Sequence, residues 1–185
     1  MFYLVLGLIL FIGAHSLREL RLREPVVNRL GEGAYKGAYS LVALAGLLLI
    51  VWGKSASPFI MIYEPRYDLR DITHFAMLPA FILFVAGNVP GSHLRSTIRN
   101  PMLLGTFIWA AAHLWANGDL ASLLLFGSIG AWAGVKFITM TLAGSGLAVK
   151  PSLAWDAVTV TAGFIGYGLV TVYHGQLFGI GLNFA

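Results

Sequence analysis

Six long apolar segments constrain this chain more than any other feature of its sequence. A helix that crosses the hydrocarbon core of a bilayer needs about 20 mostly apolar residues, within a range of roughly 17–25. The candidate segments are residues 2–17 (ending no later than 20), 38–52, 72–89, 102–116, 120–143 and 155–173. Backbone polar groups in lipid must be satisfied within the spanning structure, which a helix achieves. The sequence therefore predicts an all-α polytopic membrane protein, a bundle of about six transmembrane helices.

The composition leaves little room for a soluble alternative. Of 185 residues, 58% are hydrophobic and 11% are charged, whereas soluble domains carry about 25% charged residues. The mass of 20.0 kDa predicts one integral membrane domain over residues 1–185. The chain has no cysteine, which excludes disulfides, thiolate catalysis and Cys-ligated iron–sulfur or zinc sites.

The positive charges lie next to the apolar segments, so the net charge of +4 indicates membrane orientation and not nucleic-acid binding. The first, third and fifth connections hold eight Lys and Arg residues: Arg18, Arg21, Arg23, Arg29, Lys36, Arg95, Arg99 and Lys150. The second and fourth hold three: Lys54, Arg66 and Arg70. Because the more basic side is cytoplasmic, we expect both termini outside a bacterial inner (cytoplasmic) membrane. No positive residue precedes the first segment, which argues against a signal peptide.

Three connecting or packing features carry further structural signals. Residues 18–30 have helical spacing of apolar and charged side chains, which predicts a short amphipathic helix on the cytoplasmic lipid surface, limited by Pro25. The Asn-Gly-Asp run at 117–119 predicts a tight turn with positive φ, and Asp119 caps the next helix. Small residues at four-residue spacing predict close helix packing, and they occur at Gly130 and Gly134 and at Gly175 and Gly179.

The five histidines are the main chemical candidates, because ionisable groups are expensive at membrane depth. They are His15, His74, His93, His113 and His174. His93 is expected to be a solvated loop residue, and His174 lies near the outer end of its segment.

His113 and His15 stand out by their neighbours. His113 is flanked by Trp109 and by Ala110, Ala112 and Ala116. The pattern recurs at His15, beside Phe11, Ile12, Gly13 and Ala14. Such flat slots suit a macrocycle, and His is a common axial ligand of haem iron. The alternative is a histidine that is hydrogen-bonded to a neighbouring helix.

Depth in the membrane distinguishes the candidate pairs. At a rise of 1.5 Å per residue, His15 lies about 6 Å inward of its segment centre and His113 about as far outward, so they differ by roughly 12 Å. His74, at the outer start of its segment, matches His113 in depth. Geometry alone favours the pair of His74 and His113.

Several stretches of the chain carry a family pattern. The longest is RNPMLLGTFIWAAAHLWANGD at 99–119, and the others are GAHSLR at 13–18, RLGE at 29–32, YSLV at 39–42, LLFG at 124–127 and AWA at 131–133. These stretches extend over nearly the whole chain. Together they resemble the NnrU family, whose bacterial members are associated with expression of nitrite and nitric oxide reductases.

This resemblance implies a cofactor. The family is similar to the zeta-carotene isomerase of plants and cyanobacteria, a membrane enzyme that uses haem b to isomerise a cis double bond. Its haem ligands lie in motifs matching His15 and His113, so the resemblance favours these two as iron ligands, with His74 in reserve. It implies a denitrification-linked protein acting as a redox sensor or as a cis–trans isomerase of a polyene-like ligand. Asn100 and Ala110 replace a His and a Cys of that isomerase, which puts carotenoid isomerisation in doubt.

Two other functions remain open. The chain also carries an Arg-x-Pro motif with a following aliphatic residue and glycine: Arg99, Pro101, Leu104 and Gly105. This motif resembles membrane methyltransferases of the isoprenylcysteine type, which bind S-adenosylmethionine through polar and acidic groups on a C-terminal helix. Residues 120–185 contain one carboxylate side chain, Asp156, which makes that site hard to assemble. A non-catalytic assembly factor is the second alternative.

Lys136 and Asn117 complete the candidate cofactor-binding residues, together with Trp109. Lys136 lies about 7 Å inward of its segment centre, where an ammonium needs an anionic partner. A haem propionate or Asp156 would serve, and snorkelling to the interface is the alternative. Asn117 lies one turn after His113, where it could orient the imidazole.

Overall fold

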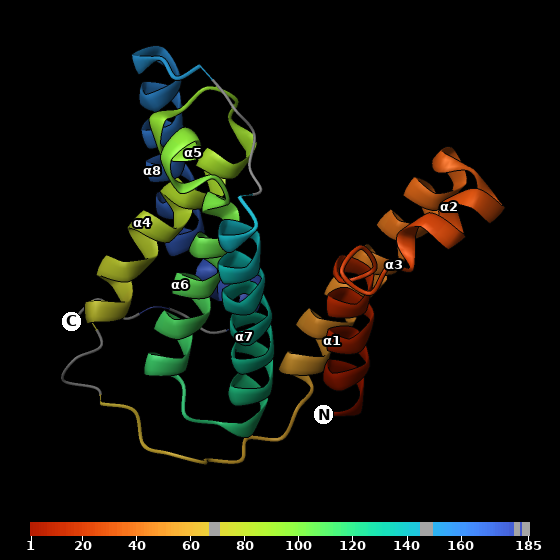
Figure 1. Cartoon of the computed structure of the whole chain (residues 1–185). Coiled ribbons are helices and arrows are strands. Elements are labelled where there is room, and N and C mark those ends of the chain that lie inside the picture. The colour runs from red at the N-terminus through yellow and green to blue at the C-terminus, as the bar shows by residue number, and fades with distance from the viewer. Residues whose placement is uncertain (67–70, 145–149, 180–181, 183–185) are drawn as a thin grey trace. The chain divides into compact units, whose positions relative to one another are not determined.

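All regular elements in the part of the chain that the computed structural model describes, residues 1–66, 71–144, 150–179 and 182, are α-helices (Figure 1). They are α1 (Phe2–His15), α2 (Arg23–Leu30), α3 (Glu32–Ser55), α4 (Asp71–Asn88), α5 (His93–Ile98), α6 (Pro101–Ala116), α7 (Leu120–Leu142) and α8 (Leu153–Phe178). Four of them, α3, α4, α7 and α8, have the length and apolar composition to cross a membrane. The all-α polytopic membrane fold is thereby confirmed.

Each of the six predicted segments contains one apolar helix, but two helices are longer than predicted. α3 begins at Glu32 instead of residue 38, after Gly31 with φ of +81°. The Glu32 carboxylate pairs with Arg23 at 3.0 Å and with Lys36 at 3.5 Å, which supports the extra turns. α8 continues past residue 173 to Phe178.

The end of α8 gives one glycine of the predicted pair at 175 and 179 a role in ending the helix, while the predicted packing role of the pair stays a prediction. Gly179 is left-handed, with φ of +75°, and its N–H donates to the Gly175 carbonyl at 2.9 Å. A left-handed glycine is a common way to end a helix. Gly179 therefore closes α8, and within the described ranges an added Cβ at Gly179 would meet nothing within 4 Å.

Two apolar helices are shorter than a membrane span. α1 has 14 residues and ends at His15, before the predicted 17 or 20, and α6 has 16 residues. At a rise of 1.5 Å per residue they are about 21 and 24 Å long, against a hydrocarbon core of about 30 Å. The predicted amphipathic helix is shorter too: α2 begins at Arg23, with Pro25 in its first turn, where a missing N–H costs no hydrogen bond.

The chain groups into two compact units, and the single integral membrane domain over residues 1–185 stays a prediction. The first contains Met1–Ile60 and Asp119–Leu125, and the second Met61–Gly118 and Phe126–Ala185. In the first unit α1 and α3 lie side by side (Figure 1). In the second unit α4 packs against both α6 and α8.

Glycines bring α1 and α3 into backbone contact. A Cβ at Gly7 would lie 2.7 Å from the Ile50 nitrogen, and one at Gly53 would lie 2.3 Å from the Leu4 nitrogen. Leu4 is fully buried. Small residues at a helix crossing allow such an approach and gain dispersion contacts. Spacing along the sequence does not predict this interface, because its glycines are split between two helices.

Glycines also allow close helix packing in the second unit, between α6 and α7 and between α4 and α8. Added Cβ atoms at Gly130 and Gly134 would lie 2.9 Å from the Ala110 Cβ and 3.1 Å from the Phe107 ring. The predicted packing role of this pair is thus confirmed, on the face of α7 toward α6. Gly163 brings α8 equally close to Ile82 of α4.

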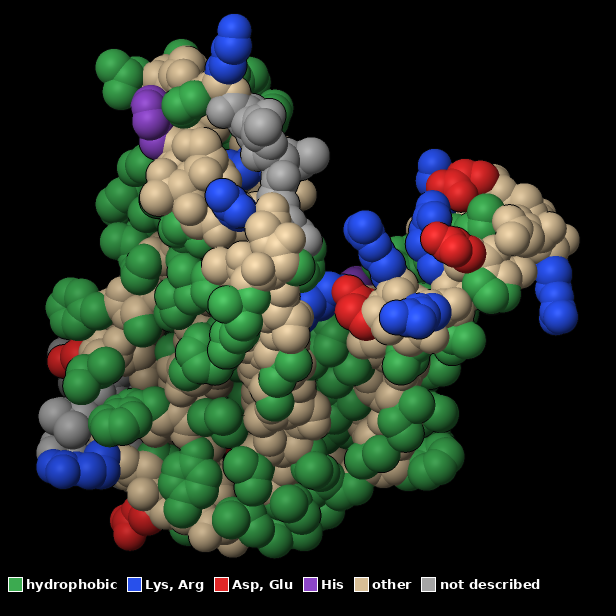
Figure 2. Space-filling model, viewed as in Figure 1, with side chains coloured by type: hydrophobic (Ala, Val, Ile, Leu, Met, Phe, Trp, Pro, Cys, Tyr) green, Lys and Arg blue, Asp and Glu red, His purple; other side chains and the backbone are tan. Residues whose placement is uncertain are grey.

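Large apolar side chains remain exposed along the helices. Phe75 is 79% exposed, Leu41 70% and Leu142 83%. Figure 2 shows hydrophobic side chains spread over the visible face, with few charged groups among them. Soluble monomers rarely expose apolar patches beyond a few hundred Å², so this surface is suited to a lipid bilayer.

The close approach at Gly53 generates a prediction. Gly53→Ala should destabilise the packing of α1 on α3 by about 1–3 kcal/mol, as overpacking does, because the new methyl meets the backbone of Leu4. Gly37→Ala, in the same helix, is the matched control, since an added Cβ there meets nothing. Melting followed by circular dichroism in detergent checks this. Equal melting temperatures for the two variants would contradict the packing argument.

Candidate functional site

His113 lies near the end of α6, and two groups fix its imidazole. Its Nδ1 is 2.8 Å from the carbonyl oxygen of Trp109, one turn earlier. The ring stacks on Phe126 of α7, with centroids 4.5 Å apart and planes at 29°. Trp109 packs edge-on against the same Phe126 at 5.0 Å.

His15, the last residue of α1, repeats this local geometry. Its Nδ1 is 2.8 Å from the carbonyl oxygen of Phe11, one turn earlier. Its ring lies 4.3 Å from the Phe11 ring and 5.5 Å from the Tyr39 ring of α3. Both histidines therefore have an aromatic residue four positions earlier that supplies a carbonyl and a ring contact.

The shared hydrogen bond determines the tautomer of both imidazoles. A carbonyl oxygen only accepts, so Nδ1 must carry the hydrogen, and in a neutral ring Nε2 then holds the lone pair. Metal-ligating histidines commonly donate their other N–H to a backbone carbonyl in this way. In His15 and His113 alike, Nδ1 therefore donates to the backbone of its own helix.

The predicted slots differ between the two sites. Ala110 is fully buried, and a Cβ at Gly130 of α7 would lie 2.9 Å from its Cβ. Ala110 therefore packs against α7, and no slot for a macrocycle is left on that side of α6. At Gly13, by contrast, an added Cβ would meet nothing within 4 Å.

The structure places His15 in the first unit and His113 and His74 in the second. The Thr73 hydroxyl donates to the Ala112 carbonyl at 3.3 Å, so the first turn of α4 lies beside α6 next to His113. This agrees with the matching depth expected for His74. Among the described residues, no three His, Asp or Glu side chains form a metal-binding group.

His93 is not a freely solvated loop residue as predicted, because it begins α5 and binds Asp156. Both oxygens of that carboxylate accept from His93, the backbone N–H at 2.7 Å and Nδ1 at 2.5 Å. Asp156 was one proposed partner of Lys136. The Lys136 ammonium lies 5.0 Å from the ring centroid of Trp132, in cation–π geometry.

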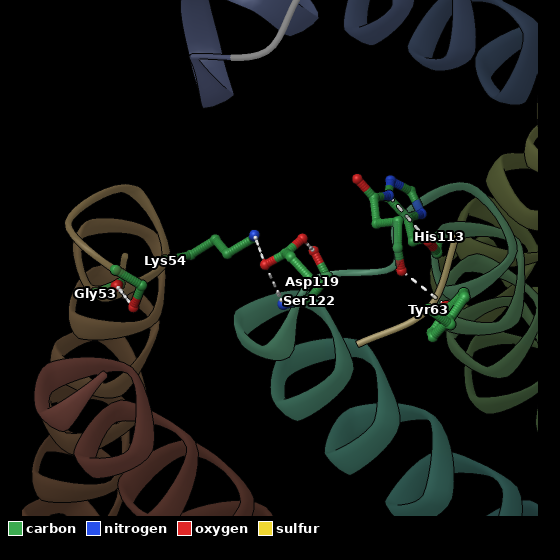
Figure 3. A network of polar contacts seen from close by, with 8 residues as sticks. Gly53, Lys54, Tyr63, His113, Asp119 and Ser122 are labelled. Atoms are coloured by element: carbon green, nitrogen blue, oxygen red, sulfur yellow. Dashed lines mark hydrogen bonds and ion pairs between the residues drawn. The ribbon is translucent and has the colours of Figure 1, made fainter. Parts of the chain in front are cut away.

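Asp119 caps α7 as predicted and also forms an ion pair that the sequence analysis missed. Its Oδ1 accepts from the Ser122 N–H at 3.0 Å and from Lys54 at 2.8 Å, and its Oδ2 from the Ser122 hydroxyl at 2.5 Å (Figure 3). The Asp119 side chain is 7% exposed. Lys54 and Asp119 belong to the second and fourth connections, which charge counting had placed on one side of the membrane.

The environment of Asp119 changes its acidity. Burial alone raises the pKa of this carboxyl, but the hydrogen bonds from Lys54 and Ser122 outweigh it and hold the pKa below its ordinary value. The ionised form is thus the stable one in the folded protein.

The segment after α6 is fixed to residues 62–63. The Tyr63 hydroxyl donates to the backbone carbonyls of Leu114 and Asn117 (Figure 3). The carbonyl of Gly118 accepts from the N–H groups of Ile62 and Tyr63 at 2.8 and 3.1 Å. An added Cβ at Gly118 would lie 1.8 Å from the Tyr63 oxygen.

These contacts correct two sequence interpretations. Gly118 is not among the positive-φ residues of the described chain, so glycine is required there by the close approach of Tyr63 and not by the turn. Asn117 donates to the backbone carbonyl of His113 at 2.9 Å. This contact is with the main chain at the end of α6. The His113 ring is oriented instead by the hydrogen bond that its Nδ1 donates to the Trp109 carbonyl.

Fold and site together define an all-α polytopic membrane protein whose candidate functional groups are histidines in apolar helices. The chain belongs to the NnrU family: the model of that family, described as NnrU protein, matches residues 3–182. The match therefore extends over both compact units. Comparisons with curated proteins and with solved structures gave no match.

The lowered pKa of Asp119 generates a prediction about pH. A carboxyl whose folded pKa lies below its unfolded value contributes stability that is present above the unfolded pKa and is lost as pH falls through the folded pKa. Acidification should therefore destabilise the wild-type protein more than Asp119→Asn. At neutral pH, Lys54→Met should cost about 1.5–3 kcal/mol, the value of a hydrogen bond to a charged group. Melting temperatures measured from neutral to acidic pH check both, and parallel pH profiles of the wild type and Asp119→Asn would contradict this role of Asp119.

Proposed function

We propose that this NnrU-family membrane protein binds haem b through His15 and His113, with His74 as the reserve ligand. The observation that carries the proposal is the shared tautomer: both imidazoles donate Nδ1–H to a carbonyl one turn earlier. In a neutral imidazole with this tautomer, Nε2 is the nitrogen that would bind iron. Two neutral histidine donors suit haem iron.

Other residues of the chain have supporting roles in this proposal. Phe126 and Trp109 hold the His113 ring in one orientation, and Phe11 and Tyr39 do so for His15. Lys136 is a cation on α7 that suits a propionate. Asn117 fixes the end of α6, which keeps the backbone beneath His113 in place.

Haem in this position would supply redox chemistry and gas binding. Membership of the NnrU family supports a denitrification-linked role, and the distribution of Lys and Arg residues supports a bacterial inner membrane protein with both termini outside. We propose redox sensing or cis–trans isomerisation of an apolar polyene-like ligand. With haem bound, a substrate or a gas would reach the iron only if one of the two histidines were released, and because the chain has no Cys, His74 and His174 would be the replacement ligands.

Haem binding is tested by absorption spectroscopy of the full-length protein, purified in detergent from cells with ample haem, in oxidised and reduced states. We expect a six-coordinate haem b spectrum. His113→Ala should abolish it, since an axial ligand is lost. His93→Ala is the matched control and should retain it, because His93 is engaged by Asp156. Protein without haem under these conditions would contradict the proposal and leave the assembly-factor function.

Ligand exchange distinguishes the two proposed activities. Adding nitric oxide to the reduced protein should displace histidine and replace the bis-histidine spectrum by that of a nitrosyl haem, which is five-coordinate once both histidines have left the iron. An isomerase should also convert a supplied cis-polyene, detected by chromatography, whereas a sensor should give no product. A bis-histidine spectrum that persists under nitric oxide, with no isomerised product, would exclude both activities.

A further inference from the structure

The segment between α4 and α5 is locked onto the beginning of α8. The Gly91 carbonyl accepts from the Ser152 N–H at 2.9 Å. Gly91 has φ of +87°, and a Cβ there would lie 2.7 Å from the Trp155 ring. Ser92 is fully buried and caps α5 by accepting from the Arg95 N–H at 3.1 Å. The backbone that leads into His93 is therefore fixed.

His93 and Asp156 form a pair whose orientation is fixed by this backbone. The carboxylate binds both the backbone N–H and Nδ1 of His93, at 2.7 and 2.5 Å. Nδ1 is thus engaged, and within the described ranges of the chain no residue hydrogen-bonds to Nε2. This nitrogen accepts when the imidazole is neutral and donates when it is protonated.

The pair lines a groove between α5 and α8. The groove has a volume of about 340 Å³, within the roughly 300–1,000 Å³ of small-molecule sites. Its apolar wall comes from Leu94, Ile98 and Val160. Asp156 lies in the first turn of α8, and Val160 lies one turn further into this membrane-spanning helix. Along α8 the groove thus changes from polar to apolar.

The charges of the groove restrict its ligand. A carboxylate in the lining disfavours an anionic head such as a phosphate or a fatty acid. That carboxylate is already engaged by His93, so a cationic head has no unpaired partner there. An uncharged hydrogen-bonding head on an apolar tail is complementary to both features. Such a molecule would reach the groove by diffusing within the bilayer.

We infer that this groove binds the head of a lipid-soluble quinone, next to Nε2 of His93. A quinone carbonyl accepts a hydrogen bond from the protonated imidazole, and a quinol hydroxyl donates to the neutral one. The His93 ring therefore matches both forms of this ligand, whereas a lipid alcohol exists in one form only. This site lies apart from His113 in the chain and goes beyond the haem proposal.

Binding of decylubiquinone to the full-length protein in detergent, measured by quenching of tryptophan fluorescence, tests the inference. Val160→Phe fills the groove and should weaken binding at least tenfold. Val158→Phe is the matched control, since Val158 is exposed on the same helix and does not line the groove. His93→Ala and Asp156→Asn should each weaken binding about tenfold through loss of the hydrogen-bonding pair.

Two results would overturn the inference. One is equal affinity of the Val160→Phe and Val158→Phe variants for decylubiquinone. The other is full displacement of the quinone by equimolar palmitate or phosphatidylglycerol, which would make the groove a general lipid contact. Circular dichroism identifies variants that fail to fold, and the valine pair is decisive even if a polar variant does not fold. Haem content, recorded in parallel, should not differ between the two valine variants.

Discussion

The cost of an unsatisfied polar group in an apolar medium determines most of this structure. In the described part of the chain, no buried side-chain nitrogen or oxygen is without a hydrogen-bond partner. His15 and His113 bind carbonyls of their own helices, and Lys54 and Asp119 neutralise each other. These contacts satisfy the polar atoms and also give each group one orientation. The hydrogen bonds that offset the cost of burying these polar groups therefore also hold their side chains in one orientation.

Much of the fold could be predicted because the hydrophobic pattern of a membrane protein is strong. All six apolar helices were found, and the packing face at Gly130 and Gly134 was found from spacing alone. Helix ends were less accurate. α3 starts at Glu32 because Gly31 and the charges of Arg23 and Lys36 support extra turns, which a hydropathy criterion does not include.

Contacts between distant parts of the sequence were the main omissions. Gly53 meets Leu4, and Lys54 meets Asp119, only after the chain has folded. Local sequence patterns do not predict contacts between residues that are far apart in the chain. At the candidate site, the residue type and the aromatic residue four positions earlier were visible in sequence, whereas Phe126 on His113 was not. The alanines beside His113 favour a ligand slot in the sequence, but Ala110 is fully buried and packs on α7 at Gly130.

The lengths of α1 and α6 have a consequence for the surrounding lipid. These two helices carry His15 and His113, and they are the shortest apolar helices of the described chain. A hydrophobic stretch that is too short is accommodated by local thinning of the bilayer or by movement of flanking residues to the interface, at a cost of fractions of a kcal/mol per Å. The free energy of the folded protein in the bilayer then depends on the acyl-chain length of the surrounding lipids. Short-chain lipids reduce the difference between bilayer thickness and the length of the helices that carry His15 and His113, and long-chain lipids increase it.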